Sequence, residues 1–237
     1  MVLSIVIPCF DEAATIETIV ARAVAAPVHC SRQLIVVDDG STDASPSIIE
    51  ALPAKYAGRT DVSFVVVRHP SNRGKGAAVR TGIGRATGDV ILIQDADLEY
   101  DPHDYPKLLE PIVERGASVV FGTRRDSRRL SRAEPRHWRF IAAVWLLTAL
   151  ANALYQAKLT DYATGYKAFT KSVADRLALR ADGFEVDAEI TARVRTLGYD
   201  IVEVPIRYQP RSIADGKKVR GRDGLRAAWM LVREKIV

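Results

Sequence analysis

Cysteine is scarce in this sequence: Cys9 and Cys30 are the only two among 237 residues. Two cysteines cannot build a disulfide framework, and they do not form the closely spaced pair that binds zinc. The four histidines, at positions 29, 69, 103 and 137, are scattered and lack the spacing of metal ligands. The N-terminus also lacks the basic stretch, apolar core and cleavage site of a signal peptide. These absences exclude a disulfide-stapled or zinc-finger protein and predict a reducing, cytoplasmic location.

Long hydrophobic runs are missing too. The most apolar stretch, residues 140–155, has 16 residues and includes Asn152, whereas a membrane-spanning helix needs about 20. Aromatic residues make up 7% of the chain and are sparse among its basic residues. This sparseness argues against a surface that stacks on nucleic-acid bases, so we expect no nucleic-acid partner.

Two glycine-rich cofactor motifs are also absent. The first predicted strand, residues 3–10, runs into Asp11 and Glu12 instead of the glycine fingerprint of dinucleotide-binding folds. The glycine-lysine loop of P-loop enzymes is missing as well. The sequence therefore excludes the two commonest phosphate-binding signatures of α/β proteins.

What the chain does contain is an uneven positive charge. Its net charge is +5, and two segments carry most of the excess. Residues 124–139 hold seven arginines against two acidic residues, and residues 207–237 hold nine basic residues against three acidic ones. Clusters of this kind suit an anionic partner such as phosphate, a lipid surface or nucleic acid.

The first half of the chain alternates predicted strands with predicted helices. The expected strands are residues 3–10, 34–37, 62–67, 90–93 and 117–121, and the expected helices are residues 12–26, 76–85 and 103–115. This alternation predicts an α/β fold with a doubly wound sheet, whose ligands lie at the carboxyl ends of the strands. Beyond residue 122 we expect helices at 138–156, 171–179, 188–197 and from 224 onward, with a strand at 201–208. No internal repeat or linker divides the chain, so one domain with a C-terminal elaboration is predicted.

Three carboxylates follow the buried strand 90–93, namely Asp95, Asp97 and Glu99. Alternate residues of an extended chain point the same way, so the three side chains are predicted to converge. Such convergence is costly without a cation, and hard oxygen ligands suit Mg²⁺ or Mn²⁺. The alternative is a solvated acidic loop that merely ends the strand.

Two other strand ends have alternative interpretations. In the segment 38–43, Asp43 is expected to cap a helix, and Asp39 is placed to accept a hydrogen bond from a nucleotide base. The segment 72–76 is either an ordinary turn or a phosphate site. In the second case Gly74 and Gly76 admit a diphosphate close to the backbone, and Lys75 supplies charge.

Taken together, the motifs resemble a known family. They are IVIPCFDE (5–12), VVDDGSTD (36–43), NRGKGAAVRTG (72–82), QDADLE (94–99), FGTR (121–124), LTDYATGYKAF (159–169), FEVDAEI (184–190), and VEVPIRYQPRS with GKK (202–218). Their order and spacing resemble the inverting family-2 glycosyltransferases of GT-A fold. The resemblance is greatest to polyprenyl-phosphate hexosyltransferases of the dolichyl-phosphate mannosyltransferase type. Asp11 stands where asparagine is usual, and Glu99 where some members carry glutamine, but neither removes an expected ligand.

The resemblance implies a role for each matched position. It assigns the nucleotide base and ribose to Pro8, Phe10, Glu12 and Asp39. It assigns the metal to Asp95 and Asp97, with Glu99 as an additional ligand, and implies a divalent cation that bridges the donor diphosphate. It assigns acceptor or donor phosphate to Arg124, Arg139, Arg211, Lys217 and Lys218, and catalysis to Asp95, Asp97 and Arg124. Asp187 and Glu189 lie near the position of a catalytic base in hydroxyl-accepting relatives, and are expected here to orient the sugar or a basic residue.

The implied reaction is the transfer of a hexose, mannose or glucose, from a nucleotide-diphosphate sugar to polyprenyl phosphate, with inversion. A phosphate monoester is largely dianionic at pH 7, because its second pKa is about 6, so it needs no catalytic base. Two alternatives remain. One is a family-2 enzyme that uses a glycan or small-molecule hydroxyl, and the other is a non-enzymatic module that binds anionic lipid or nucleic acid.

The resemblance also implies one domain over residues 1–237, with a nucleotide-sugar half (1–122) and an acceptor half (123–237). Within the second half, apolar residues recur at helical spacing between residues 140 and 154. This helix either covers the sheet or lies in a membrane interface with Arg136 and Arg139 near lipid phosphates. The second interpretation predicts peripheral binding at the inner face of a membrane.

Overall fold

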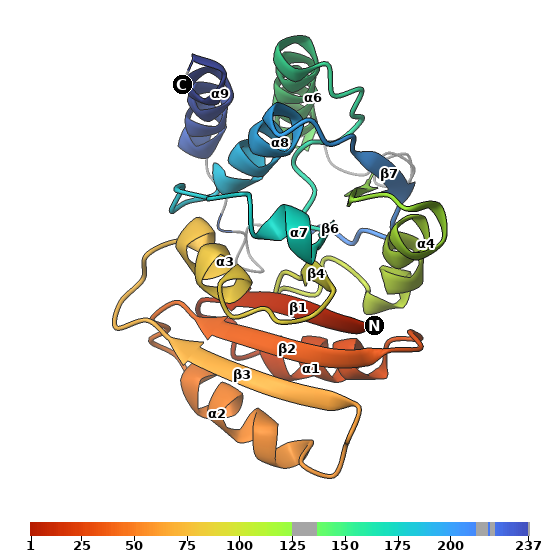
Figure 1. The fold of residues 1–237 in the computed structure, drawn as a ribbon. Helices are drawn as coiled ribbons and strands as arrows, with labels where there is room; N and C mark the ends of the chain where they lie inside the picture. Colours follow the sequence, from red (N-terminus) through yellow and green to blue (C-terminus); the bar gives the residue numbers. More distant parts are fainter. Residues whose placement is uncertain (125–136, 212–217, 219–220, 237) are drawn as a thin grey trace.

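Seven strands form one mixed sheet through the middle of the molecule (Figure 1). The structure is a computed structural model that describes residues 1–124, 137–211, 218 and 221–236. The strands lie in the order β3-β2-β1-β4-β6-β5-β7. Their bounds are β1 (Val2–Cys9), β2 (Ser31–Asp38), β3 (Val62–Arg68), β4 (Val90–Ile93), β5 (Val119–Thr123), β6 (Lys167–Thr170) and β7 (Val202–Pro205).

The first four strands are parallel, as the alternating pattern predicts. They are connected by α1 (Ile16–Ala25), α2 (Ser45–Lys55) and α3 (Lys75–Ile83). The cap expected at Asp43 predicted the start of α2, but the extent of this helix was not predicted. It carries Pro53 inside its length and a second proline in its first turn, and prolines of this kind obscure a helical pattern.

The strand β6 is antiparallel and lies between β4 and β5. No strand was predicted between the expected helices 138–156 and 171–179, so this strand was missed. It is only four residues long and begins with a lysine, neither of which is typical of a central strand. Its register pairs Lys167 with Ile93, the last residue of β4. The lysine therefore lies at the edge of the sheet where β4 ends.

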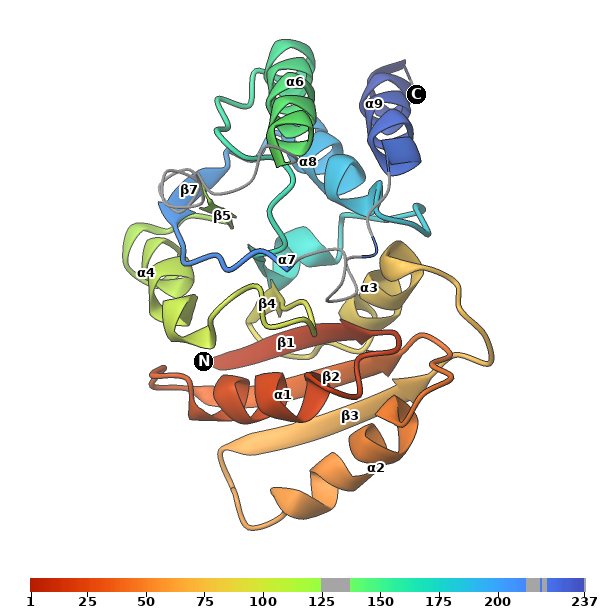
Figure 2. The same cartoon turned by 180° about the vertical axis from the view of Figure 1, so that it is seen from behind.

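Two hydrophobic layers cover the sheet, because alternate residues of each strand point to opposite faces. The further helical elements are η1 (Pro102–Asp104), α4 (Tyr105–Arg115), α6 (His137–Tyr155), α7 (Lys171–Ala174), α8 (Val186–Thr196) and α9 (Gly221–Ile236). One layer packs side chains of α3, α6, α8 and α9 against Val6, Ile35 and Ile91. The other packs α1, α2 and α4 against Ile5, Leu34 and Leu92. In both views α6, α8 and α9 lie together at one end of the molecule (Figures 1 and 2).

The shortfall in helix length noted from the sequence holds for the described part of the chain. None of its helices combines the length and the apolar character that crossing a bilayer requires.

Candidate active site

The acidic segment after β4 is a turn and not an extended chain. The strand ends at Ile93, and Leu98 has a left-handed backbone with φ of 59°. The prediction that Asp95, Asp97 and Glu99 converge through strand alternation was therefore wrong. Within the described residues, no group of three acidic, histidine or cysteine side chains is arranged to hold a metal ion. Each of the three carboxylates instead has its own partner.

Asp95 lies between a lysine and a glycine. Its Oδ1 is 2.8 Å from Nζ of Lys75, the first residue of α3. On the other side its carboxylate lies against Gly165, where an added Cβ would overlap Oδ2. Only glycine leaves room for the carboxylate at this distance. The strand end, the α3 start and the loop before β6 therefore fix the position of Asp95 together.

Asp187 lies between two lysines. Its Oδ1 is 2.6 Å from Nζ of Lys167, which is wholly buried, and its Oδ2 is 3.7 Å from Nζ of Lys75. Nζ of Lys167 also donates to the carbonyl of Thr164. Burial alone would raise the pKa of Asp187, but the two lysines hold it below its ordinary value. Lys167, Asp187, Lys75 and Asp95 thus form a chain of alternating charges, which we call the charge chain.

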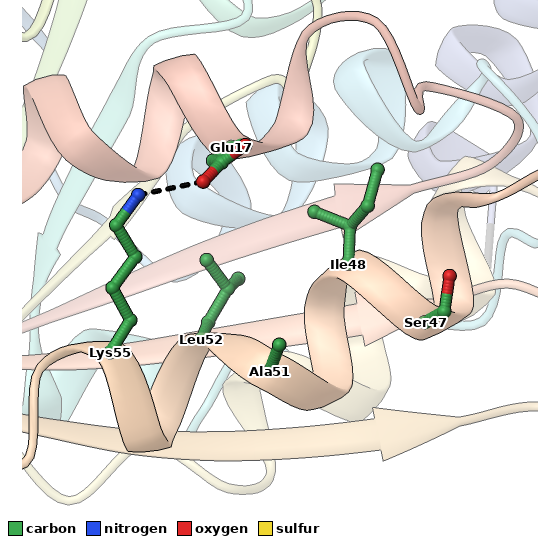
Figure 3. A pocket seen from close by; sticks show the side chains of 6 residues that line it. All are labelled: Glu17, Ser47, Ile48, Ala51, Leu52 and Lys55. Carbon is green, nitrogen blue, oxygen red and sulfur yellow. Dashed lines mark hydrogen bonds and ion pairs between the residues drawn. The ribbon is translucent and has the colours of Figure 1, made fainter.

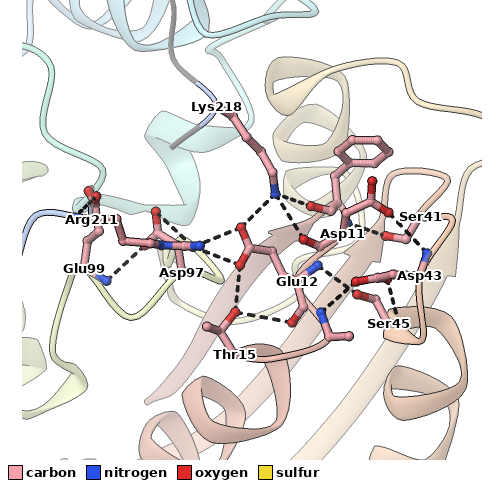
Figure 4. Close-up of polar contacts among 12 residues, drawn as sticks. Asp11, Glu12, Thr15, Ser41, Asp43, Ser45, Asp97, Glu99, Arg211 and Lys218 are labelled. Carbon is pink, nitrogen blue, oxygen red and sulfur yellow. Dashed lines mark hydrogen bonds and ion pairs between the residues drawn. The ribbon is translucent and has the colours of Figure 1, made fainter. Parts of the chain in front are cut away.

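Glu12 is the centre of a second group of charges (Figure 4). Nη2 of Arg211 lies 2.9 Å from both of its carboxylate oxygens, and Nζ of Lys218 lies 2.8 Å from Oε1. Thr15 donates to Oε2 at 2.7 Å. Burial would raise the pKa of Glu12, but hydrogen bonds from Lys218 and Arg211 lower it. The structure thus brings the end of β1 together with residues about 200 positions away in the sequence.

Arg211 also connects this group to the acidic turn. Its Nη2 is 3.6 Å from Oδ2 of Asp97, and its backbone N–H donates to Oε1 of Glu99 at 2.8 Å. Oδ1 of Asp97 accepts the backbone N–H of Glu99 at 3.1 Å. Glu99 therefore holds the chain at Arg211, and its carboxylate does not join those of Asp95 and Asp97 in one cluster.

Asp39 is buried and its carboxylate holds the loop before α3. It accepts the backbone N–H groups of Arg73 and Gly74, the latter at 2.7 Å, and lies 2.6 Å from Nδ1 of His69. Nε2 of the same histidine lies 3.0 Å from the hydroxyl of Thr81 on α3. The sequence analysis gave His69 no role. No spacing in the sequence could reveal it, because Asp39 and His69 meet only through the pairing of β2 with β3.

The glycines of the segment 72–76 make room for another part of the chain. A Cβ on Gly74 or Gly76 would collide with the backbone of Ala181 and Asp182. That backbone is held by Glu189, whose buried carboxylate accepts the N–H groups of Arg180 and Ala181 and pairs with Nε of Arg193 at 3.0 Å. The loops before α3 and α8 therefore interlock by backbone contact.

Arg124 is buried in an ion pair. Its Nε and Nη2 lie 2.6 and 2.7 Å from the two carboxylate oxygens of Asp161, which is itself wholly buried. Its guanidinium also lies over the ring of Tyr208, 5.0 Å from the centroid. This bidentate pair fixes the loop that carries Gly165. Asp161 lies in the motif LTDYATGYKAF (159–169), but its pairing with Arg124 was not predicted from the sequence.

The remaining predicted residues are found at the end of β1 or outside the described part. Pro8 and Phe10 are half-buried there, and Nζ of Lys218 donates to the carbonyl of Phe10. The side chain of Arg139, in α6, lies outside the described residues, and so do Lys217 and Arg136.

Asp11 and Asp43 hold the ends of β1 and β2 together. Oδ1 of Asp11 accepts the N–H of Thr42 at 2.7 Å. Asp43 accepts the N–H of Ser45 at the start of α2, in line with the predicted cap, and also the N–H of Ala13.

A shallow hollow between α1 and α2 lies apart from these groups (Figure 3). It is lined by Glu17, Ser47, Ile48, Ala51, Leu52 and Lys55. Its charged members, Glu17 and Lys55, pair with each other at 2.6 Å. It contains none of the predicted site residues, so the carboxyl ends of β1, β2 and β4 remain the candidate active site.

Comparisons with known proteins identify the family of the chain. The family profile described as "Glycosyl transferase family 2" matches residues 4–178. The dodecaprenyl-phosphate galacturonate synthase of Rhizobium johnstonii is 32% identical over 182 residues, which cover 76% of this chain and 51% of that protein. The dolichol-phosphate mannosyltransferase of Pyrococcus furiosus is 28% identical over 221 residues, covering 92% of this chain and 59% of that protein. The chain thus spans between half and three-fifths of the length of these two relatives.

Solved structures show the same fold. The glucosyl-3-phosphoglycerate synthase of Mycobacterium tuberculosis, crystallised with Mn²⁺, UDP and glucosyl-3-phosphoglycerate, matches with a TM-score of 0.70 and 20% identity. The match covers all of this chain and 80% of the other. A second structure of that synthase, with Mg²⁺ and UDP, matches with a TM-score of 0.68. The architecture is therefore that of the GT-A fold, as the resemblance implied.

Proposed function

The chain belongs to glycosyl transferase family 2, and from this premise we propose that it transfers a hexose, mannose or glucose, from a nucleotide-diphosphate sugar to a polyprenyl phosphate. The names of the two relatives support a polyprenyl-phosphate acceptor. The proposal divides the single domain into a donor half, residues 1–122, and an acceptor half, residues 123–237.

The observation that carries the proposal is how Asp187 and Glu189 are paired. These two residues lie near the position of the catalytic base in hydroxyl-accepting relatives. Asp187 is held as a carboxylate between Lys167 and Lys75, which lowers its pKa and hence its basicity. Glu189 is wholly buried and accepts from two backbone N–H groups and Arg193. A hydroxyl acceptor needs a base with a pKa near the working pH. A phosphate monoester needs none, because it is already ionised at pH 7.

The donor side of the site is rich in paired charges. Lys75 and Arg211 are the cationic groups next to Asp95 and Asp97, and Glu12 lies beside Arg211 and Lys218. We propose that the donor diphosphate binds among these groups and that the nucleoside contacts Pro8, Phe10 and Glu12 at the end of β1. Asp39 contributes by holding the backbone of residues 73–74 against this pocket.

The carboxylates of the site can hold a divalent cation together with a substrate phosphate. Mg²⁺ and similar ions are commonly held by one or two carboxylates together with substrate phosphates. Asp95 and Asp97 supply two carboxylates, 17% and 26% exposed, whereas Glu99 is occupied by the backbone of Arg211. We therefore propose Asp95 and Asp97 as ligands of Mg²⁺ or Mn²⁺, with the diphosphate completing the set. A bound cation offsets the negative charge that develops on the leaving diphosphate.

The reaction then requires positioning more than proton transfer. An oxygen of the acceptor phosphate forms a bond to the anomeric carbon on the face opposite the diphosphate. The bond between that carbon and the diphosphate oxygen breaks, and its electron pair leaves with the nucleoside diphosphate. No proton moves in this step. Lys75 and Arg211 orient the diphosphate. The pair of Arg124 with Asp161 fixes the loop that places Gly165 against the carboxylate of Asp95.

A polyprenyl-phosphate acceptor requires the protein to act at the inner face of a membrane, where this lipid is presented. The test combines labelled GDP-mannose or UDP-glucose with polyprenyl phosphate, with and without EDTA. We expect one donor to yield labelled lipid and EDTA to abolish the product. Transfer only to glycan or small-molecule hydroxyls would contradict the acceptor, and full activity in EDTA would contradict the cation.

A further inference from the structure

Over residues 141–155, the part of α6 whose side chains the structure describes, the exposed positions are all apolar. They are Ala142, Ala143, Trp145, Leu146, Ala149 and Ala153, and the side chain of Trp145 is 72% exposed. The two polar side chains between residues 141 and 154 turn away from this surface. The Thr148 hydroxyl donates to the carbonyl of Val144, and the Asn152 amide bonds the backbone of Leu159 in both directions. A helix on the surface of a globular protein normally presents polar groups to water.

The helix α9 also exposes large apolar side chains, and arginine side chains lie beside them. Leu225, Trp229 and Ile236 are 76%, 65% and 77% exposed, and their spacing of four and seven residues places them in one stripe. Arg222 and Arg226, four residues apart and therefore on the same side of the helix, are exposed directly beside this stripe. Neither forms an ion pair with a described residue. The opposite side of α9 is buried through Ala227, Met230 and Leu231.

The two helices lie side by side at the same end of the molecule (Figures 1 and 2). The Tyr155 hydroxyl at the end of α6 donates to the carbonyl of Leu231 at 2.6 Å, and Lys235 lies over the ring of Tyr155. The same α6 reaches the candidate site, because the Thr148 hydroxyl accepts the N–H of Tyr162, next to Asp161. This end of the acceptor half is therefore packed together and contacts the loop that carries Asp161.

We propose that the outward sides of α6 and α9 form one membrane-docking face, with Trp145 and Trp229 at headgroup depth and Arg222 and Arg226 beside anionic headgroups. The inference rests on the proposed function in one respect, since a lipid-phosphate acceptor is presented at a bilayer surface. Tryptophan suits this depth because its ring is apolar and its N–H is polar. Amphipathic helices with arginine beside their apolar side bind such surfaces in the interface plane.

Charge distinguishes a bilayer from a second copy of the chain as the occupant. A two-fold interface pairs the same surface with itself, so it would bring the arginine row of one α9 close to that of the other. Like charges in that arrangement oppose association. An anionic bilayer complements the same arginines while covering the apolar stripe.

Vesicle flotation tests the proposal with four proteins. They are the wild type, the double variant Trp145→Ser/Trp229→Ser, the double variant Arg222→Gln/Arg226→Gln, and the control Val113→Ser. Val113 is 58% exposed on α4, which covers the other face of the sheet. The vesicles contain phosphatidylcholine alone or phosphatidylcholine with phosphatidylglycerol. Circular dichroism confirms that each variant is folded.

We expect the wild type and Val113→Ser to float with the anionic vesicles, and less so in high salt. The tryptophan variant should bind about tenfold more weakly or worse, and the arginine variant should lose the preference for anionic lipid. The face is not a membrane surface if the wild type floats with neither vesicle, or if Val113→Ser loses as much binding. Equal binding to both vesicles at all salt concentrations removes the arginine contribution.

Two further measurements separate this proposal from its alternatives. In sedimentation without lipid, a wild-type dimer that the tryptophan change dissociates would identify the face as a contact between copies and overturn the proposal. Activity towards a short, water-soluble isoprenyl phosphate should be unchanged by the tryptophan change, whereas activity towards vesicle-borne polyprenyl phosphate should fall. Flotation of a protein that transfers sugar to neither acceptor would contradict the proposed function and leave the docking face supported.

Discussion

The two ends of this molecule differ in how fully their side chains are satisfied. At the carboxyl ends of β1, β2 and β4, nearly every charged group discussed has a partner within hydrogen-bond reach, and several are wholly buried. On the outward sides of α6 and α9, large apolar side chains are 65–77% exposed. Burying a polar group costs free energy unless the group is hydrogen-bonded. A large exposed apolar surface also costs free energy unless a partner covers it. We therefore interpret the first region as a preformed site and the second as the proposed docking face.

The largest expected effect comes from the acidic turn. Asp95→Asn removes a charge from the proposed cation site, and we expect transfer to fall by about a thousandfold or more. The matched control is Asp89→Asn at the start of β4, whose side chain is 67% exposed and far along the strand from the site. Steady-state kinetics of both variants decide the matter. Comparable losses of transfer activity in the two variants would mean that the change perturbs strand β4 and not the cation site.

The buried pair of Arg124 with Asp161 should dominate stability. Arg124→Met removes the guanidinium that neutralises the buried carboxylate of Asp161 and keeps the backbone N–H that donates to it. Breaking a buried ion pair in this way costs about 3–5 kcal/mol. Urea unfolding measures the loss. The double variant Arg124→Met/Asp161→Leu removes both charges and should recover much of it, since no uncompensated charge remains. A single variant as stable as the wild type would show that the pair is not a structural connection.

Gly165→Ala should have a smaller and more local effect. The added Cβ overlaps the Asp95 carboxylate, so we expect transfer to fall about ten- to a hundredfold as that group is displaced. Gly198→Ala is a poor control because Gly198 has a φ of 85°, whereas Gly58→Ala meets no atom within 4 Å. Gly58→Ala should retain full activity. Equal activity of both variants would contradict the role of Gly165 as the support of Asp95.

The smallest expected effect is a loss of stability in acid. The folded-state pKa of Glu12 is lowered by Lys218 and Arg211, against the effect of burial. Its stabilising contribution is therefore complete above the unfolded-state pKa, about 4.3, and declines as pH falls through the lower folded-state value. Glu12→Gln should flatten this part of the pH–stability curve measured by urea unfolding. An unchanged slope between pH 5 and about 2 would contradict the pairing.

The sequence predicted the parallel half of the sheet and the polar residues at its carboxyl edge, because buried strands and turn residues are local signals. It missed β6, since a four-residue strand that begins with a buried lysine has no recognisable pattern. It indicated the start of α2 through the Asp43 cap but not the extent of the helix, whose prolines obscure the pattern. Both elements are stabilised by tertiary packing, which a linear pattern does not contain.

The candidate site shows the same division. The positions of Glu12 and Asp95 at strand ends followed from the sequence, and Glu12 lies where the proposal places the nucleoside. Their partners did not follow, because Arg211 and Lys75 reach them only through the folded topology. The extended geometry assumed for Asp95, Asp97 and Glu99 failed, since Leu98 turns the chain. The roles expected of Arg139 and Lys217 stay predictions.

The central claim is that the acceptor is a phosphate that needs no catalytic base. The direct measurement supplies one long-chain polyprenyl lipid in two forms, the phosphate and the free alcohol, with the same labelled nucleotide sugar. We predict labelled lipid from the phosphate alone, with a rate that does not require a group titrating near neutral pH beyond the acceptor itself. Transfer to the alcohol at an equal or higher rate would contradict the claim.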